Sequence, residues 1–179
     1  MVDYIDSLGV QCVVQGNGYC IEVDPKDKTF EEGLYRNGLR DSIWKGISDT
    51  SHTSFVEVYQ QGKLISGVST QKDEQTLNYS KVLILPAYKG GIAAFSRYLS
   101  SHLTYPTEAY NKKIGGKVTL SFVVKKDGTL TDIKILKHVY PSIDTEALRV
   151  LKNTRDWEPG RYRGVPVRIV FIQTIAFNL

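Results

Sequence analysis

Lys117-Val118-Thr119-Leu120-Ser121-Phe122-Val123-Val124-Lys125 is the stretch that decides the fold of this chain of 179 residues. Its apolar side chains fall at every second position from Val118 to Val124, which predicts a β-strand with one apolar face. Asp127-Gly128 follows and is a two-residue hairpin signal. If these residues form the turn, Val124 lies opposite Thr131, Phe122 opposite Ile133 and Leu120 opposite Ile135. The isoleucines then share the apolar face, so turn chemistry and hydrophobic pattern agree on one hairpin.

Helical patterns flank this hairpin. Between Gly90 and Leu103, apolar residues recur at helical spacing, and Ile92 belongs to the stripe expected to be buried. Pro106 suits the first turn of a short helix over residues 106–112. A further helix follows Pro141, with Ser142 as its expected N-cap. A last strand from Val165 to Phe177, apolar on both faces, completes an α+β order of helix, helix, strand, strand, helix, strand.

The first half of the chain alternates short β-type runs with glycine-centred turns. The turns Tyr35-Arg36-Asn37-Gly38 and Tyr59-Gln60-Gln61-Gly62 lie 24 residues apart. Residues 32–44 and 55–67 resemble variant MORN-like hairpin repeats. We therefore predict a small N-terminal antiparallel β-hairpin array over residues 1–69, with Trp44, Phe55, Val58 and Tyr59 in its core. A linker over residues 70–84, in which Leu77 and Tyr79 could add a strand, then leads to a second domain over residues 85–179.

Charge also separates the two halves. Residues 1–87 have a net charge of −4 and residues 88–179 a net charge of +8. This asymmetry favours two units with different surfaces. The basic half contains no run of basic residues with interleaved aromatic residues, so nucleic acid is not an expected partner.

Patterns for catalysis or metal binding are absent from the sequence. His52, His102 and His138 lie far apart and fit no nucleophile–base arrangement, and Lys89-Gly90-Gly91 lacks the rest of a phosphate loop. No further Cys or nearby His joins Cys12 and Cys20 in a metal site. A tight turn at Gly16-Asn17-Gly18 does not place these cysteines directly opposite each other, which favours two free thiols over a disulfide. We expect no enzyme activity, no cofactor and no metal.

Several motifs of the second half, taken in order, resemble the C-terminal domain of TonB energy transducers. They are Tyr105-Pro106-x-x-Ala109, Gly116-Lys117-Val118, Phe122-Val123-Val124, Asp127-Gly128, Glu146-Ala147-Leu148, Trp157-Glu158-Pro159-Gly160 and Gly164-x-Pro166-Val167. The resemblance implies a two-helix, three-stranded antiparallel domain in the periplasm. It also implies binding of the TonB box, a short extended segment of a TonB-dependent outer-membrane receptor, by β-augmentation on the last strand.

Carried over to this sequence, the resemblance places the peptide-binding edge at Val165, Val167, Arg168, Ile169, Val170 and Phe171, and a receptor-proximal segment at Tyr105 and Pro106. Where the family often has a basic residue after that proline, this chain has Thr107 and Glu108. Arg161, Arg163 and Arg168 would favour an acidic peptide, or they are ordinary solvated charges.

The resemblance does not extend to energy transduction. Full transducers have an N-terminal transmembrane helix and a proline-rich spacer, whereas residues 1–80 contain only Pro25, and the acidic start of the chain lacks the pattern of a signal peptide. The inner-membrane motor complex is a partner only if an anchor precedes this sequence. The alternative function is a soluble cell-envelope adaptor that binds another envelope protein or peptidoglycan. An exposed last strand could also pair with a second copy in a homodimer.

Overall fold

The structure is a computed structural model that describes residues 3–6, 9–25, 28–49 and 51–179. Its contacts divide the chain into two compact units. The first consists of residues 1–83 together with Tyr162–Val165, and the second consists of Ile84–Arg161 together with Pro166–Leu179. The division therefore follows residue 83 rather than a 70–84 linker, and it assigns a short piece of the C-terminal half to the N-terminal unit. The start of the predicted array, residues 1–2, lies outside the described residues.

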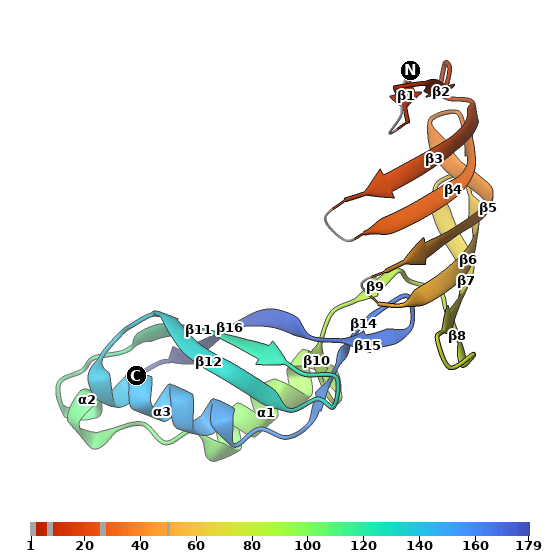
Figure 1. The fold of residues 1–179 in the computed structure, drawn as a ribbon. Helices are drawn as coiled ribbons and strands as arrows, with labels where there is room; N and C mark the ends of the chain where they lie inside the picture. Colours follow the sequence, from red (N-terminus) through yellow and green to blue (C-terminus); the bar gives the residue numbers. More distant parts are fainter. Residues whose placement is uncertain (1–2, 7–8, 26–27, 50) are drawn as a thin grey trace. The chain divides into compact units, whose positions relative to one another are not determined.

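The N-terminal unit is built on one antiparallel sheet with the strand order β3-β4-β5-β6-β7-β8 (Figure 1). Its strands are β3 (Gly18–Asp24), β4 (Thr29–Arg36), β5 (Leu39–Ser48), β6 (Thr53–Gln60), β7 (Lys63–Gln71) and β8 (Thr76–Tyr79), and β1 (Tyr4–Ile5) pairs with β2 (Gln11–Val13) before them. The predicted array is thus a six-stranded meander. Residues 76–79 form a strand inside the segment predicted as a linker, as the pattern of Leu77 and Tyr79 had suggested. The MORN-like resemblance itself stays a prediction.

Three aromatic side chains of this sheet lie over glycines on the adjacent strand. Trp44 is paired with Gly33, Phe55 with Gly46 and Tyr79 with Gly67. A Cβ at Gly33 or Gly67 would lie 2.3 Å from the partner's ring, so only glycine leaves room for the ring. In a single-layer sheet this is how large apolar surfaces become buried without a second layer. Trp44, Phe55 and Tyr59 are buried as predicted, but Val58 faces the opposite side and is exposed.

Cys12 and Cys20 form a disulfide, so the expectation of two free thiols is wrong. The chain turns at Gln15-Gly16, where Val14 and Asn17 exchange both backbone hydrogen bonds. Counting outward from that pair would set Cys12 opposite Tyr19. The Cα atoms of Cys12 and Cys20 are nevertheless only 5.1 Å apart, within the range that a disulfide spans. Counting outward from the turn therefore did not reveal this pairing.

The C-terminal unit contains a three-stranded antiparallel sheet in the order β12-β11-β16, with its helices on one face (Figure 1). The strands are β11 (Gly116–Val124), β12 (Leu130–Lys137) and β16 (Ile169–Phe177), and the helices are α1 (Gly91–His102), α2 (Thr107–Asn111) and α3 (Pro141–Lys152). The predicted order of elements is confirmed, with the five-residue α2 as a helix beyond the two that the resemblance implies. The remaining short strands are β9 (Leu83–Ile84), β10 (Ala87–Tyr88), β13 (Trp157–Glu158), β14 (Gly160–Tyr162) and β15 (Val165–Val167).

The core of this unit lies between the sheet and the helices. Val118, Leu120, Phe122 and Val124 are all fully buried, as the alternation of the opening stretch predicted. They pack with α1 and α3, chiefly through Phe95, Ile143, Ala147, Val150 and Leu151. Ile92, expected in the buried stripe of α1, is instead 70% exposed.

The β11–β12 register matches the prediction at one end and differs at the other. Leu120 lies opposite Ile135, as predicted, but Val124 lies opposite Leu130 instead of Thr131. The loop has three residues rather than two, since Lys125 donates its N–H to the carbonyl of Thr129. Gly128 at φ 79° closes the loop, and Asp132 at φ 53° adds the bulge residue that restores the expected pairing further along.

The start of α3 also differs from the prediction. The N-cap residue is Tyr140, and Ser142 lies inside the helix with its hydroxyl buried and unpaired. Asp144 provides hydrogen bonds at the start of the helix instead. Its carboxylate accepts hydrogen bonds from the Val139 N–H at 3.0 Å and from His138 at 2.8 Å. An acidic side chain in the first turn of a helix is favourable there.

Candidate functional site

Strand β16 lies at an edge of the three-stranded sheet, and β11 is its partner along its whole length. Alternate residues of β16 differ in exposure. Phe171 and Ile175 turn toward the core, whereas Val170 and Ile172 on the outer face are 67% and 59% exposed. An edge strand presents a row of backbone N–H and C=O groups on its unpaired side. This edge is therefore able to accept a further strand.

The residues predicted for the peptide-binding edge fall into two strands rather than one. Ile169, Val170 and Phe171 belong to β16, but Val165 and Val167 belong to β15, which is hydrogen-bonded to β14 in another sheet. Arg168 lies between the two strands and belongs to neither. The reason is a tight turn at Arg163-Gly164, whose φ values of 50° and 80° pair β15 with β14 as a short hairpin. A continuous strand from Val165 to Phe177 was thus a wrong prediction.

The predicted arginines Arg168 and Arg163 differ in their surroundings. Arg168 lies 3.5 Å from the carboxylate of Asp132, and both side chains are exposed. Arg163, in contrast, is 3% exposed and lies in the N-terminal unit. Its charge is used inside the protein, so Arg163 is not a contact for an acidic peptide.

Tyr105 and Pro106 lie at the far end of β16 from Phe171. The Tyr105 hydroxyl donates a hydrogen bond to the Ile114 carbonyl at 2.7 Å, and its ring packs edge-on against Phe177. Pro106 precedes the first turn of α2. Phe177 lies six positions after Phe171, which is about 20 Å along a strand. The structure therefore does not bring the two predicted parts of the site together.

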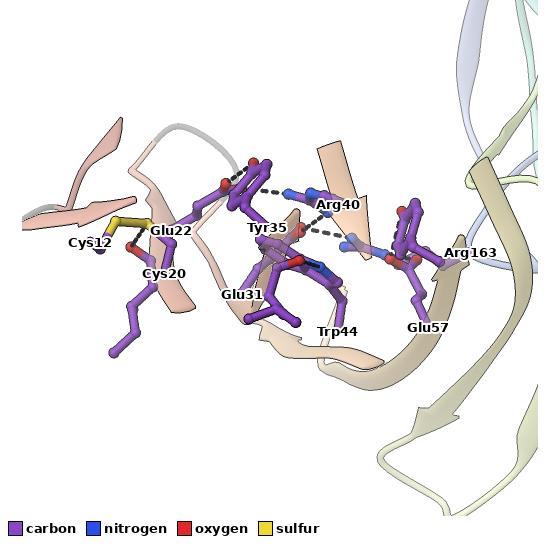
Figure 2. Close-up of polar contacts among 12 residues, drawn as sticks. Cys12, Cys20, Glu22, Glu31, Tyr35, Arg40, Trp44, Glu57 and Arg163 are labelled. Carbon is purple, nitrogen blue, oxygen red and sulfur yellow. Dashed lines mark hydrogen bonds and ion pairs between the residues drawn. A yellow bond between two sulfur atoms is a disulfide. The ribbon is translucent and has the colours of Figure 1, made fainter. Parts of the chain in front are cut away.

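Arg163 lies at the centre of a polar network on the face of the N-terminal sheet that carries Trp44, Phe55 and Tyr79 (Figure 2). Its guanidinium donates to Glu57 at 2.9 Å and to Glu31 at 2.7 Å, and it stacks 3.4 Å from the centre of the Phe55 ring. Glu57 is fully buried and also accepts hydrogen bonds from the hydroxyls of Tyr59 and Tyr79. A buried carboxylate with this many donors is held in place rather than poised to react.

Glu31 links Arg163 to a second arginine. Its other carboxylate oxygen accepts a hydrogen bond from Arg40 at 2.8 Å, and Arg40 also pairs with Glu22 and lies over the Trp44 ring. Figure 2 shows the resulting alternation of Glu22, Arg40, Glu31, Arg163 and Glu57. Burial opposes the charge on Arg40, but Glu31 and Glu22 outweigh it and raise the arginine pKa above its ordinary value. Burial, and then the charge of Glu57, raise the pKa of Tyr59 to about 12.

The described residues contain no cluster of three or more His, Cys, Asp or Glu side chains that could hold a metal ion. Within the same residues, no helix combines the length and the apolar character needed to cross a membrane. His138 is engaged at the start of α3 with Asp144.

An α+β domain with an open edge strand is the class of structure that the C-terminal unit represents. Residues 101–179 match the family model described as Gram-negative bacterial TonB protein C-terminal. The resemblance inferred from the sequence is thereby confirmed for these residues. The segment from Ile84 to Ser100 and the whole N-terminal sheet lie outside the match.

Solved structures similar to this chain include two NMR structures of the Helicobacter pylori TonB C-terminal domain, covering its residues 194–285 and 179–285. They are 25% and 26% identical to this chain, and the matches cover 49% of it and 91% and 79% of those chains, each with a TM-score of 0.39. No curated protein matches the chain.

Proposed function

We propose that this chain is a non-enzymatic periplasmic protein whose C-terminal unit binds the TonB box of an outer-membrane receptor by addition of an extended strand to β16. The observation that carries the proposal is the position of β16 at the sheet edge, with β11 as its partner. Main-chain hydrogen bonds along such an edge give affinity with little dependence on the peptide's side chains. One edge could therefore serve several receptors in energy-dependent transport.

The disulfide supports a periplasmic location. Disulfides form and persist in oxidising compartments such as the bacterial periplasm and are rare in the cytosol. Cys12 and Cys20 are bonded, and the matched family is one of Gram-negative bacteria. Coupling to the inner-membrane motor complex belongs to the membrane anchor of full transducers, so the proposal for this chain is confined to receptor engagement.

The proposed edge is shorter than the one derived from the sequence. It comprises Ile169, Val170 and Phe171 and continues along β16, whereas Val165 and Val167 are assigned to the β14–β15 hairpin. Tyr105 and Pro106 remain a proposed second contact with the receptor. Because they lie near Phe177, this contact would be separate from the contact at Ile169, Val170 and Phe171.

Proline substitutions at adjacent positions test the edge from the protein side. In an antiparallel pair, the N–H groups of successive residues point to opposite sides of the strand. Of Val170→Pro and Phe171→Pro, one will remove a hydrogen bond to β11 and lower the melting temperature. The other will remove a donor on the open side and weaken binding of a fluorescent TonB-box peptide about tenfold or more, measured by anisotropy.

Each proline variant is compared with alanine at the same position, so that loss of the side chain is subtracted. If both proline variants are folded and each binds the peptide as tightly as the alanine variant at the same position, strand addition at β16 is contradicted.

A second candidate is an envelope adaptor, which the outer face of the N-terminal sheet favours. This face is the one opposite Trp44, and it exposes Phe30, Ile47, Val56 and Val68 around a shallow groove of about 390 Å³. Exposed apolar patches of this kind mark interaction surfaces. Co-sedimentation with purified peptidoglycan, lost in Val56→Glu, from a chain that does not bind a TonB-box peptide would support this function over receptor engagement.

A further inference from the structure

A small apolar hollow lies between α1 and β16 on the helix-facing side of the sheet. It has a volume of about 160 Å³, and its walls include Tyr88, Ile92, Phe95, Trp157, Phe171 and Gln173. All of these residues belong to the C-terminal unit. The residues of α1 that line it are Gly91, Ile92 and Phe95, and all three lie outside the residues that match the TonB family model.

The walls of the hollow are buried, packed aromatic side chains, except at its rim. Tyr88, Phe95 and Trp157 are buried, and the ring centres of Phe95 and Trp157 are 5.5 Å apart, as Trp157 and Phe171 are at 5.6 Å. Ile92 differs, because 70% of this apolar residue is exposed at the first turn of α1. Its exposure contradicts the buried stripe predicted for the helix. The exposed side chain lines the hollow and could contact a ligand there.

The position of the hollow relative to β16 makes it a neighbour of the open edge. Phe171 and Gln173 are alternate residues of β16 and share its helix-facing side. A strand added beside β16 also places every second side chain on that side. Directly opposed side chains in paired strands lie about 5 Å apart. One side chain of the added strand, opposite Phe171 or Gln173, is therefore directed at the hollow.

The volume and chemistry of the hollow define what it accepts. An apolar cavity of about 150 Å³ holds a benzene molecule. A hollow of similar size with aromatic and aliphatic walls fits one aromatic or large aliphatic side chain and disfavours a charged one, which would lose its hydration there.

We propose that this hollow is a side-chain pocket that selects an extended peptide by one aromatic or large aliphatic residue. The inference rests on the proposed strand addition to β16 and gives that otherwise backbone-driven interaction its specificity. Backbone pairing supplies affinity for any extended segment, and the pocket fixes the register, because a shift by one residue would turn the anchoring side chain to the opposite face.

The test is an alanine scan of a TonB-box peptide, combined with Ile92→Asp in the full chain. Ile92 is exposed, so the substitution leaves folding intact and places a charge at the rim of the pocket. We expect alanine at one apolar peptide position, and Ile92→Asp, each to weaken binding about 10- to 100-fold. The two losses should not add when combined, because both remove the same contact.

Leu136→Asp is the matched control. Leu136 is likewise an exposed aliphatic residue, but it lies on β12, the strand furthest from β16 in the sheet, and this variant should bind as the unmodified chain does. Tight peptide binding that is unchanged by Ile92→Asp and by every alanine would overturn the pocket and leave strand addition standing. Failure of the unmodified chain to bind the peptide at all would overturn both.

Discussion

Replacing Arg163 with methionine is expected to destabilise the N-terminal sheet by about 3–5 kcal/mol, the cost of leaving one partner of a buried ion pair alone. Glu57 would keep its fully buried carboxylate and lose the guanidinium 2.9 Å away. Stacking on Phe55 would be lost as well. The backbone contacts of the turn, from the Arg163 N–H to Val82 and from the Ser69 hydroxyl to the Arg163 carbonyl, would remain.

Denaturant unfolding followed by tryptophan fluorescence measures this effect. The chain has two tryptophans, Trp44 in the N-terminal unit and Trp157 in the C-terminal unit, so a Trp157→Phe background reports the N-terminal unit alone. Adding Glu57→Gln to Arg163→Met should recover much of the loss, because the buried charge disappears. Arg36→Met, which removes an exposed arginine of the same unit, should stay within about 0.5 kcal/mol. An equally small effect of Arg163→Met would contradict the buried network.

Gly33→Ala is expected to destabilise the same sheet by about 1–3 kcal/mol through overpacking alone. Gly33 has an ordinary φ, so alanine adds no backbone strain there. Its Cβ would instead meet the Trp44 ring at 2.3 Å, and that ring is fully buried with its N–H bonded to the Leu34 carbonyl. The ring must move, which should shift the Trp44 emission as well as the unfolding midpoint.

A double-mutant cycle separates this clash from a general intolerance of alanine in β4. In a Trp44→Leu background, Gly33→Ala should cost little, since alanine is the better strand residue once the ring is gone. Unfolding in both backgrounds can be monitored by the tyrosine circular dichroism of the sheet. If Gly33→Ala lowers the free energy of unfolding equally in the two backgrounds, the ring does not lie on Gly33.

The elements that could be predicted from sequence are those set by local pattern. The alternation from Val118 to Val124 gave the buried face of β11, and turn chemistry placed a hairpin after it. The register near the turn was missed by one residue, because Asp127-Gly128 signals a turn without fixing its length. The Thr129 N–H bonds the Asp127 carboxylate and stabilises the longer loop, a contact between side chain and backbone that alternation does not encode.

The features that could not be predicted depend on residues far apart in the chain. Glu31 and Arg163 are 132 positions apart, and nothing in the local sequence of either shows that they meet. For the site, Arg163-Gly164 between Tyr162 and Val165 was a usable hairpin signal, and it would have indicated that Val165 begins a hairpin strand rather than a long last strand. The exposure of Ile92 needed the packed structure, because helical periodicity assigned it to the buried stripe.

The central claim is that an extended peptide pairs through its backbone with the open edge of β16. Two TonB-box peptides, N-methylated at alternate residues, test it most directly, because in a strand alternate N–H groups point to the same side. One methylated set would face β16 and the other solvent. Titration of the full chain should show one peptide binding about tenfold or more weakly and the other binding as the unmodified peptide does. Equal affinities of the two methylated peptides would contradict the account.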